Sequence, residues 1–383
     1  MSALTCRFTA FDTWFFREAR PQGSIGQSEL SSVFPPPINT LLGAVRTAIG
    51  DEWHALNGTN WREFHHLKEL QALIGFGDDL GPLRCNGPYI SLDGERLYPA
   101  PAHLLRKDDT YFLLELGDPV MCDLGKVHLP IMPTHVHGLA NLAGAKTLDN
   151  TWLTQAGLLS VLSGKAPQSS QVRTASDLFI NEPRIGIGRD NQRSAVHEGL
   201  LYQTRHLRLQ PNVAVEIDLF NLSQPDLLAK GRNVRLGGEG RLANLSVTDT
   251  QTAPLNCDFS PAAGELICLV NMTAAETAPG LPLGIPPGFC AKQDEHGVTT
   301  WAGELQGLHL NILSVACSRP LREGGWDLAQ HQSRPVRSWI APGSVLFARV
   351  NDESHFVSSG DAYGRNQWLL SSCPISTAAR TSS

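Results

Sequence analysis

The sequence predicts an α+β fold in which strands outnumber helices. Short runs of alternating apolar and polar residues recur along the whole chain, whereas only a few stretches show helical spacing. The 35 glycines and 25 prolines also suit strands and loops better than helices. With 383 residues, of which 42% are hydrophobic, the chain is long enough for two domains, each with a sizeable core.

The first 75 residues predict one strand and two helices. Residues 4–11 alternate as a half-buried strand does. Pro35-Pro36-Pro37 then opens a helix whose apolar positions run from Leu41 to Ile49, and Gly50 is placed as its C-cap. A second helix is expected over residues 61–74, closed by Gly75.

The middle of the chain gives the strongest turn signals. Asp93-Gly94 predicts a hairpin over residues 89–98, followed by a strand at 111–116. A helix is expected over residues 150–163, with Asn150 as N-cap and Gly164 as C-cap. Two alternating runs within 196–219 flank Gln210-Pro211-Asn212 and predict a second hairpin.

Further strands are expected at 232–247, 264–272, 343–350 and 366–370, with a long loop over 274–300. Strands, hairpins and intervening helices in this order suggest a ferredoxin-like α+β sandwich.

The eight cysteines indicate a reducing compartment. No two of them form a C-x-x-C pair, and their spacing does not resemble a disulfide framework. We find no signal-like opening and no apolar run long enough to cross a bilayer. We therefore expect a cytoplasmic protein that does not enter a membrane.

Charge is distributed unevenly along the chain. The formal net charge is −6, and residues 51–170 hold 9 basic against 14 acidic residues, a net of −5. Residues 184–241 reverse the sign, with 9 basic against 6 acidic residues, a net of +3. Only 7 of the 31 basic residues are lysine. Arginine pairs bidentately with phosphate and stacks on bases, so this bias favours nucleic acid as a partner for residues 184–241.

We find no catalytic or cofactor-binding motif. A nucleophile elbow and a Walker loop are both absent, and Gly186-Ile187-Gly188 lacks dinucleotide-binding spacing. Asp78-Asp79 follows a helix rather than occupying a hairpin turn, so an exposed turn is favoured over a metal site. His135 and His137 have no third ligand at zinc-site spacing. We expect no enzyme activity, no metal and no cofactor.

Two glycine- and arginine-containing stretches remain as candidate binding segments. In residues 183–193, Arg184, Arg189 and Arg193 decorate what we expect to be a loop. In residues 235–241, three glycines lie between two arginines, which lets the backbone approach another chain and leaves amides free for phosphate. An ordinary mobile turn is the alternative for each stretch.

Short blocks in a fixed order along the chain resemble the third subunit family of Cmr complexes, the type III-B CRISPR effectors, whose members are RAMP proteins. The blocks are Trp14-Phe15-Phe16-Arg17, Phe34-Pro35-Pro36-Pro37 with Gly43-Ala44-Val45-Arg46, Pro183-Arg184-Ile185-Gly186-Ile187 with Glu198-Gly199-Leu200-Leu201-Tyr202, Arg235 to Arg241, Gly325-Trp326-Asp327, Arg334-Pro335-Val336-Arg337 and Ala341-Pro342-Gly343-Ser344-Val345. Each block alone is unspecific, whereas their order and spacing are fairly specific.

The resemblance implies two ferredoxin-like, RRM-related RAMP domains with insertions and long loops. We place them at residues 1–225 and 226–383. The implied role is a non-catalytic subunit that holds the 5′ handle of crRNA. Such a subunit lies between the large palm-domain Cmr subunit and the backbone RAMP Cmr subunit, and guide base pairing supplies target specificity.

The resemblance also assigns RNA-binding residues. Matched motif positions expected near RNA are Arg184, Arg189, Arg193, Gly237, Gly238, Gly240 and Arg241. Arg17 and Arg46 match motif arginines that serve either RNA or the fold. Phe15, Phe16 and Tyr202 are candidate platforms for stacked bases, with a core position also open for Tyr202. The acidic 51–170 region departs from a simple RNA binder, and a protein-facing role is open for it.

Three other interpretations stay open. A stand-alone RAMP ribonuclease would cut CRISPR repeats without metal, using a histidine as general base. Its candidate histidines are His54, His65, His66, His197 and His206. The chain would otherwise be the equivalent subunit of another type III effector, or a β-rich binding module with exposed tryptophans.

Overall fold

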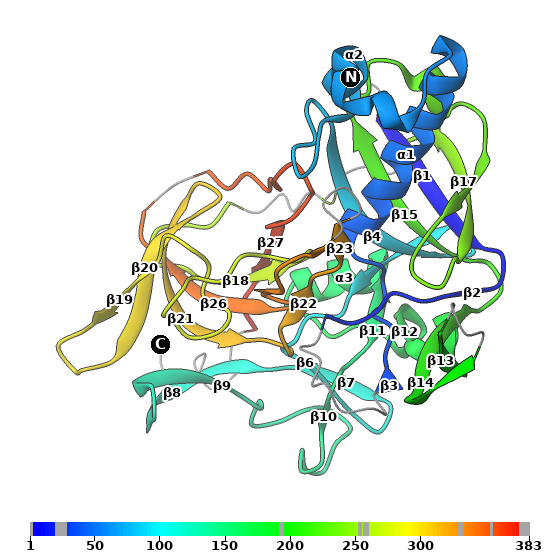
Figure 1. Cartoon of the computed structure of the whole chain (residues 1–383). Coiled ribbons are helices and arrows are strands. Elements are labelled where there is room, and N and C mark those ends of the chain that lie inside the picture. The colour runs from blue at the N-terminus through cyan, green and yellow to red at the C-terminus, as the bar shows by residue number, and fades with distance from the viewer. Residues whose placement is uncertain are drawn as a thin grey trace.

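The structure is a computed structural model that describes residues 3–19, 29–190, 195–251, 255, 260–327, 332–352 and 355–374, though not the side chains of 187–201, 326 and 327. Most of its regular secondary structure is strand, and two large sheets carry a few helices around them (Figure 1). This strand-rich mixture is consistent with the predicted α+β class.

The first sheet has eight strands in the order β12-β11-β5-β4-β15-β1-β17-β16. They are β1 (Leu4–Ala10), β4 (Arg84–Leu92), β5 (Glu95–Pro99), β11 (Thr151–Thr154), β12 (Val172–Thr174), β15 (Val213–Phe220), β16 (Arg232–Arg235) and β17 (Leu242–Asp249). The predicted strand at 4–11 is confirmed, as is the β4–β5 hairpin, where Asp93 and Gly94 both have positive φ. The sheet continues past residue 225, the expected domain boundary, as far as Asp249.

Two buried carboxylates lie on the central strand of this sheet. β15 lies between β4 and β1 and is buried along nearly its whole length, yet it carries Glu216 and Asp218. Arg96 Nε lies 2.8 Å from Glu216 Oε2, and Arg96 Nη2 lies 2.6 Å from Asp218 Oδ1. Arg7 adds a second pair with Glu216 at 2.7 Å. Because buried charges are tolerated only when they are paired and hydrogen-bonded, Arg96 is needed to hold the centre of the sheet.

The first helix is longer than the sequence predicted. α1 (Ile38–Asn57) begins after Pro37, as expected, but runs through Gly50 and ends at Gly58, which has φ 64°. The placement of Gly50 as a C-cap is therefore wrong. A Cβ at Gly50 would lie 2.3 Å from the Trp61 ring, so this glycine makes room for an aromatic side chain. The second expected helix is divided into η1 (Trp61–His66) and α2 (Lys68–Ile74), and Gly75 closes it as predicted.

The helix expected over residues 150–163 begins later than predicted, after a short strand. β11 occupies Thr151–Thr154 and pairs with β5, and only α3 (Gln155–Leu162) is helical. Asn150 is therefore not the N-cap. Thr154 has that role, because its hydroxyl accepts a hydrogen bond from the Gly157 amide at 3.2 Å. Gly164 follows the helix in the left-handed conformation.

The prediction of a hairpin within residues 196–219 is wrong, because its two strands do not pair with each other. β14 (Ala195–Leu209) pairs with β13 (Phe179–Asp190), β2 (Thr13–Trp14) and β3 (Glu29–Leu30), whereas β15 pairs with β1 and β4. The turn at 210–212 therefore passes the chain from one sheet to another. The segment 183–190, expected as a loop, is a strand of the β13–β14 hairpin.

The second sheet has six strands in the order β19-β20-β21-β26-β18-β27. They are β18 (Leu266–Asn271), β19 (Cys290–Gln293), β20 (Thr299–Leu305), β21 (Leu308–Ala316), β26 (Val345–Val350) and β27 (Trp368–Ser372). The strands expected at 264–272, 343–350 and 366–370 are confirmed. Residues 274–300 were expected to be a loop, but they contain β19 and the start of β20.

The two sheets share one hydrophobic core around α3. Leu153, Leu158 and Val161 of β11 and α3 pack in the same cluster as Val270 and Phe347 of the second sheet. Shared burial of large apolar side chains fixes one sheet against the other.

Smaller elements complete the fold. They are β6 (Leu104–Lys107), β7 (Thr110–Leu113), β8 (Glu115–Cys122), β9 (Gly125–Ile131), β10 (Lys146–Thr147), β22 (Leu321–Glu323), β23 (Trp326–Asp327), β24 (Gln332–Ser333), β25 (Arg337–Trp339), α4 (Ala175–Leu178), η2 (Ser169–Gln171) and η3 (Pro225–Leu228). β8 and β9 form a two-stranded ribbon that lies beside the second sheet (Figure 1). In the described part of the chain, no helix has the length and apolar character needed to cross a bilayer.

Candidate RNA-binding surface

Three arginines that are far apart in the sequence meet around two carboxylates. Arg184 of β13 and Arg208 of β14 each contact Asp12 and Glu182, at 2.6–3.1 Å. Arg241, just before β17, contacts Asp12 at 3.2 Å. We call these five residues the arginine cluster. Three guanidinium groups against two carboxylates leave it a formal net charge of +1.

The ion pairs of Arg184 and Arg208 favour the charged forms of the groups that they join. Hydrogen bonds from Arg184, followed by those from Arg208, lower the pKa of both Asp12 and Glu182. The same contacts, led by those with Glu182, raise the pKa of Arg184 and Arg208. The arginine side chains are 22–46% exposed, so solvent or a ligand can reach them. The carboxylates hold the guanidinium groups in a fixed arrangement while leaving surplus positive charge at the surface.

Buried aromatic rings adjoin the cluster. Phe15 and Phe16 are both only 4% exposed, so their prediction as platforms for stacked bases is wrong. Phe15 stacks on the buried His206 ring, with centroids 5.1 Å apart, and His206 Nδ1 lies 3.1 Å from Thr13 Oγ1. Burial, together with Arg241 and Arg184, lowers the pKa of His206 to about 4, so this ring is neutral at pH 7.

The glycine-rich stretch is a tight turn between β16 and β17. A Cβ at Gly237, where φ is 86°, would lie 2.6 Å from the Phe15 carbonyl oxygen, and the Gly238 amide donates to that oxygen at 2.8 Å. The close backbone approach predicted for these glycines therefore occurs, but against this chain's own Phe15. The Gly238 amide is consequently not free for phosphate. Gly240, with φ 65°, has open space where a Cβ would lie.

The other predicted arginines have different surroundings. Arg46 donates to the carbonyl oxygens of Gly77 at 2.9 Å and Asp79 at 3.5 Å, and burial lowers its pKa. The sequence left Arg46 either an RNA-binding role or a structural role, and these contacts show the structural role. Arg17 is exposed, and its backbone is bridged to Ser32. Arg189 lies on β13 with its side chain outside the described residues, and Arg193 lies outside them altogether.

Tyr202 is half-buried on the β13–β14 hairpin. It lies opposite Gly186, where a Cβ would come 2.2 Å from the Tyr202 ring. The absence of a side chain at Gly186 thus makes room for this aromatic ring.

The cluster contains three members that sequence reasoning did not select as site residues: Asp12, Glu182 and Arg208. Arg208 was counted in the basic stretch, but no motif singled it out. Asp12 lies between β1 and β2, far from the others in sequence, so only the tertiary fold shows that it joins them.

The alternative sites have structural explanations. Asp78 Oδ1 pairs with Arg334 at 2.6 Å, and Asp79 Oδ1 accepts from the Gly81 amide at 2.8 Å, so the aspartate pair forms a turn as expected. Among the described residues, no group of three or more His, Cys, Asp or Glu side chains is placed to hold a metal. Buried His54 contacts Thr59 Oγ1 at 2.7 Å and packs edge-on against Trp61.

Comparison with known proteins matches a family model described as CRISPR-associated protein (Cas_Cmr3) to residues 6–358. No curated protein matches the chain. A chain from a cryo-EM structure of the Type III-B Cmr-beta bound to cognate target RNA and AMPPnP aligns with 15% identity and a TM-score of 0.47, covering 90% of this chain and 86% of that chain. A chain from a crystal structure of the Csm1-Csm4 cassette in complex with AMPPNP aligns with 11% identity and a TM-score of 0.32, covering 97% of this chain and 95% of that chain.

The family model spans residues 6–358, which is all but the two ends of the chain. The chain belongs to the Cas_Cmr3 family of CRISPR-associated proteins.

Proposed function

We propose that this chain is a non-catalytic subunit of a type III-B CRISPR effector complex and that it holds the 5′ handle of crRNA. The observation that carries the proposal is the arginine cluster, in which three guanidinium groups from β13, β14 and the turn before β17 meet at one surface. Family membership supports the assembly, and the cluster supports RNA as its ligand.

The cluster suits a phosphate backbone. Asp12 and Glu182 fix the three guanidinium groups before a ligand arrives, which reduces the side-chain entropy lost on binding. Each guanidinium has five N–H donors, so one that already contacts a carboxylate keeps donors for a phosphate oxygen. Such contacts position RNA without reading its sequence, and guide base pairing would supply the specificity.

The strand order supports two ferredoxin-like domains. In the first sheet, the neighbouring strands β4, β15, β1 and β17 are the second, third, first and fourth of these four along the chain. In the second sheet, β21-β26-β18-β27 follow the same order. This is the order of a ferredoxin-like sheet. α1 supplies the first helix of the first domain, whereas η3 and β16 occupy the place of its second helix. The domains would then meet between Asp249 and Leu266.

The partners are part of the same proposal. We propose that the subunit lies in the cytoplasm and bridges the large palm-domain subunit to the backbone RAMP subunit, without a cofactor. Two of the five histidines proposed for a ribonuclease, His54 and His206, are buried in packing contacts, which favours a binding role over general-base catalysis.

The test is purification of the tagged full-length chain from its native host, with sequencing of the RNA and mass spectrometry of the proteins that accompany it. Short RNAs with one shared 5′ sequence, together with a palm-domain subunit and RAMP proteins, are the expected result. Recovery of an RNA-free monomer that cleaves repeat RNA would overturn the proposal in favour of a ribonuclease.

A further inference from the structure

Exposed apolar side chains are concentrated in one short segment. Of the 17 large apolar side chains that are exposed among the described residues, six lie within residues 120–132 of the β8–β9 ribbon and its end. They are Val120, Met121, Leu124, Leu129, Ile131 and Met132, and they are 41–79% exposed. Single exposed apolar residues are ordinary, but six within thirteen residues favour a contact between this segment and another molecule.

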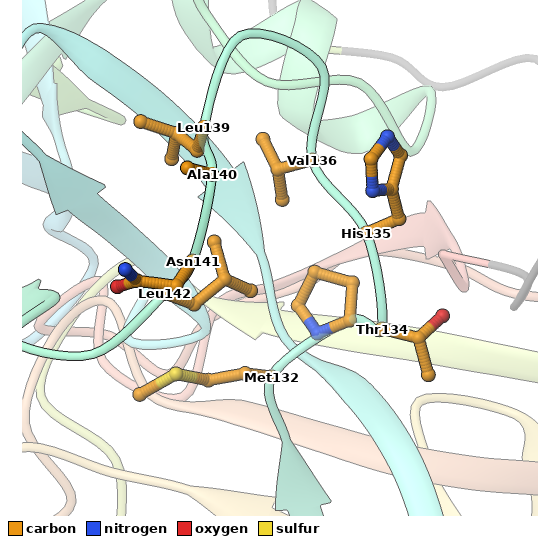
Figure 2. Close-up of a pocket in the computed structure, with 9 residues that line it drawn as sticks. Met132, Thr134, His135, Val136, Leu139, Ala140, Asn141 and Leu142 are labelled. Atoms are coloured by element: carbon orange, nitrogen blue, oxygen red, sulfur yellow. The ribbon is translucent and has the colours of Figure 1, made fainter.

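This apolar segment continues into a hollow of about 350 Å³. The chain leaves β9 at Met132, turns back as an arch and returns at Leu142 (Figure 2). Val136 and Leu142 point into the space between the two arms, whereas His135 points away from it (Figure 2). Apart from His135, no lining residue has an acidic or basic side chain. The hollow is large enough to accept an apolar side chain from a partner.

The hollow is held open by contacts within this chain. Lys107 Nζ donates to both the backbone oxygen and Oδ1 of Asn141, at 2.7 Å each, and the Leu139 amide donates to the Val136 oxygen at 3.1 Å. On the other side, Val127 is buried against the second sheet, and Ser314 Oγ donates to the His128 oxygen at 2.9 Å. A preformed hollow spares a partner the entropic cost of ordering it.

The charge around this surface selects a protein rather than RNA. Residues 115–142, which form the ribbon and the hollow, hold three acidic residues and one lysine, a formal net charge of −2. Asp118 and Asp123 are exposed on and beside β8. An acidic surface repels phosphate and attracts lysine or arginine on a partner.

We propose that the β8–β9 ribbon and the hollow at residues 132–142 dock a protein neighbour in the assembled effector. The neighbour inserts a large apolar side chain into the hollow and places basic residues against Asp118 and Asp123. An apolar anchor lets a few residues provide most of an interface's affinity, and charges elsewhere on the same ribbon favour a basic partner. This inference rests on the proposed function, since it names the surface through which the subunit meets a protein.

The experiment uses the complex co-expressed with its own subunits. Two variants are compared: Leu129→Asp with Ile131→Asp on the ribbon, and Val136→Asp in the hollow. Val357→Asp, at a side chain that is 55% exposed in the loop before β27, is the matched control. Native mass spectrometry gives the subunit content, and hydrogen–deuterium exchange compares residues 118–142 in the free chain and in the complex. The melting temperature of each isolated full-length variant shows whether it folds.

The expected result is protection of residues 118–142 in the complex and at least a tenfold loss of one protein neighbour in both surface variants, with none in the control. Complete complexes containing folded variants would overturn the inference. So would protection that ribonuclease abolishes, or a self-dimer of the isolated chain that the variants break. The two proposals can fail separately. If the ribbon variants lose a protein neighbour but the unmodified complex carries no crRNA, the RNA-holding function is wrong and the docking surface is supported.

Discussion

Arg184 and Arg241 donate to the same oxygen atom, Asp12 Oδ2, at 3.1 and 3.2 Å. The two arginines come from the two motif stretches that the sequence marked as candidate RNA-binding segments. Asp12 therefore links the β13–β14 hairpin to the turn before β17 and makes one surface of two separate stretches. The carboxylate organises the arginines but also competes with a phosphate for their donors.

Replacing this shared carboxylate should strengthen RNA binding. Asp12→Asn raises the formal charge of the arginine cluster from +1 to +2, so we expect tighter binding of RNA to the assembled complex and a steeper dependence on salt. Exposed ion pairs contribute little to stability, so the melting temperature should change little. Anisotropy titrations at several salt concentrations measure the first effect. Weaker binding would show that Asp12 acts mainly by positioning the arginines.

Two glycines of the β16–β17 turn provide a matched pair. Gly237→Ala would place a Cβ 2.6 Å from the Phe15 oxygen at φ 86°, so we expect a loss of about 2–4 kcal/mol in the free energy of unfolding. Gly240→Ala has open space at φ 65°, and should lose only about 1–2 kcal/mol. Denaturant unfolding of both variants measures the difference. Equal losses would mean that the contact with Phe15 contributes nothing.

The same logic applies to two glycines on α1. Gly43 is exposed, and nothing lies within 4 Å of the position that a Cβ would occupy, so Gly43→Ala should stabilise the protein by about 0.5–1 kcal/mol through helix propensity. Gly50→Ala would place its Cβ 2.3 Å from the Trp61 ring, so we expect destabilisation despite the same gain in propensity. Opposite signs in thermal melts are the predicted outcome. Stabilisation by both substitutions would contradict the packing role of Gly50.

Local signals in the sequence located much of the secondary structure but not its partners. Asp93-Gly94 gave a correct hairpin, because a two-residue turn fixes the pairing of its neighbours. Gly50 was misread as a cap, since a glycine that ends a helix and one that admits a distant ring look alike in sequence. The turn at Gln210-Pro211-Asn212 was placed correctly, but whether it joins paired strands depends on the rest of the sheet.

In the candidate site too, local motifs identified some residues, whereas the tertiary fold determined the others. Arg184 and Arg241 were identified because they lie in motif blocks. Asp12 and Glu182 were missed because ion-pair partners on other segments are chosen by the tertiary fold. Phe15 and Phe16 were misassigned to RNA because an aromatic residue beside an arginine has the same local pattern whether it stacks on a base or packs in a core.

The paired charges on β15 should depend on Arg96. Arg96→Met keeps an apolar stem but leaves the buried Glu216 and Asp218 without their shared partner. We expect a loss of about 3–5 kcal/mol in the free energy of unfolding, the usual result of leaving a buried charge unpaired. Denaturant unfolding at pH 7 measures it. A loss under about 1 kcal/mol would show that water or Arg7 compensates.

Stability should fall as the pH drops from 6.5 towards 4. Burial lowers the pKa of His103 to about 4, below its ordinary value of about 6.5. Between these values the unfolded chain binds a proton that the folded chain does not, so acid favours unfolding by up to about 1.4 kcal/mol per pH unit for this group. His103→Leu should flatten the dependence measured by denaturant unfolding at pH 7 and pH 5. An unchanged slope would exclude His103 as its source.

The most direct test of the RNA-holding role is crRNA retention by complexes that carry Arg184→Ala with Arg208→Ala. Arg106→Ala, which removes an exposed arginine paired with Asp109, is the control. We expect intact subunit stoichiometry, at least a tenfold loss of affinity for handle-containing RNA and a salt dependence shallower by about one to two charges. Full retention of crRNA, with the same salt dependence as the control, would contradict the assignment of the arginine cluster to RNA.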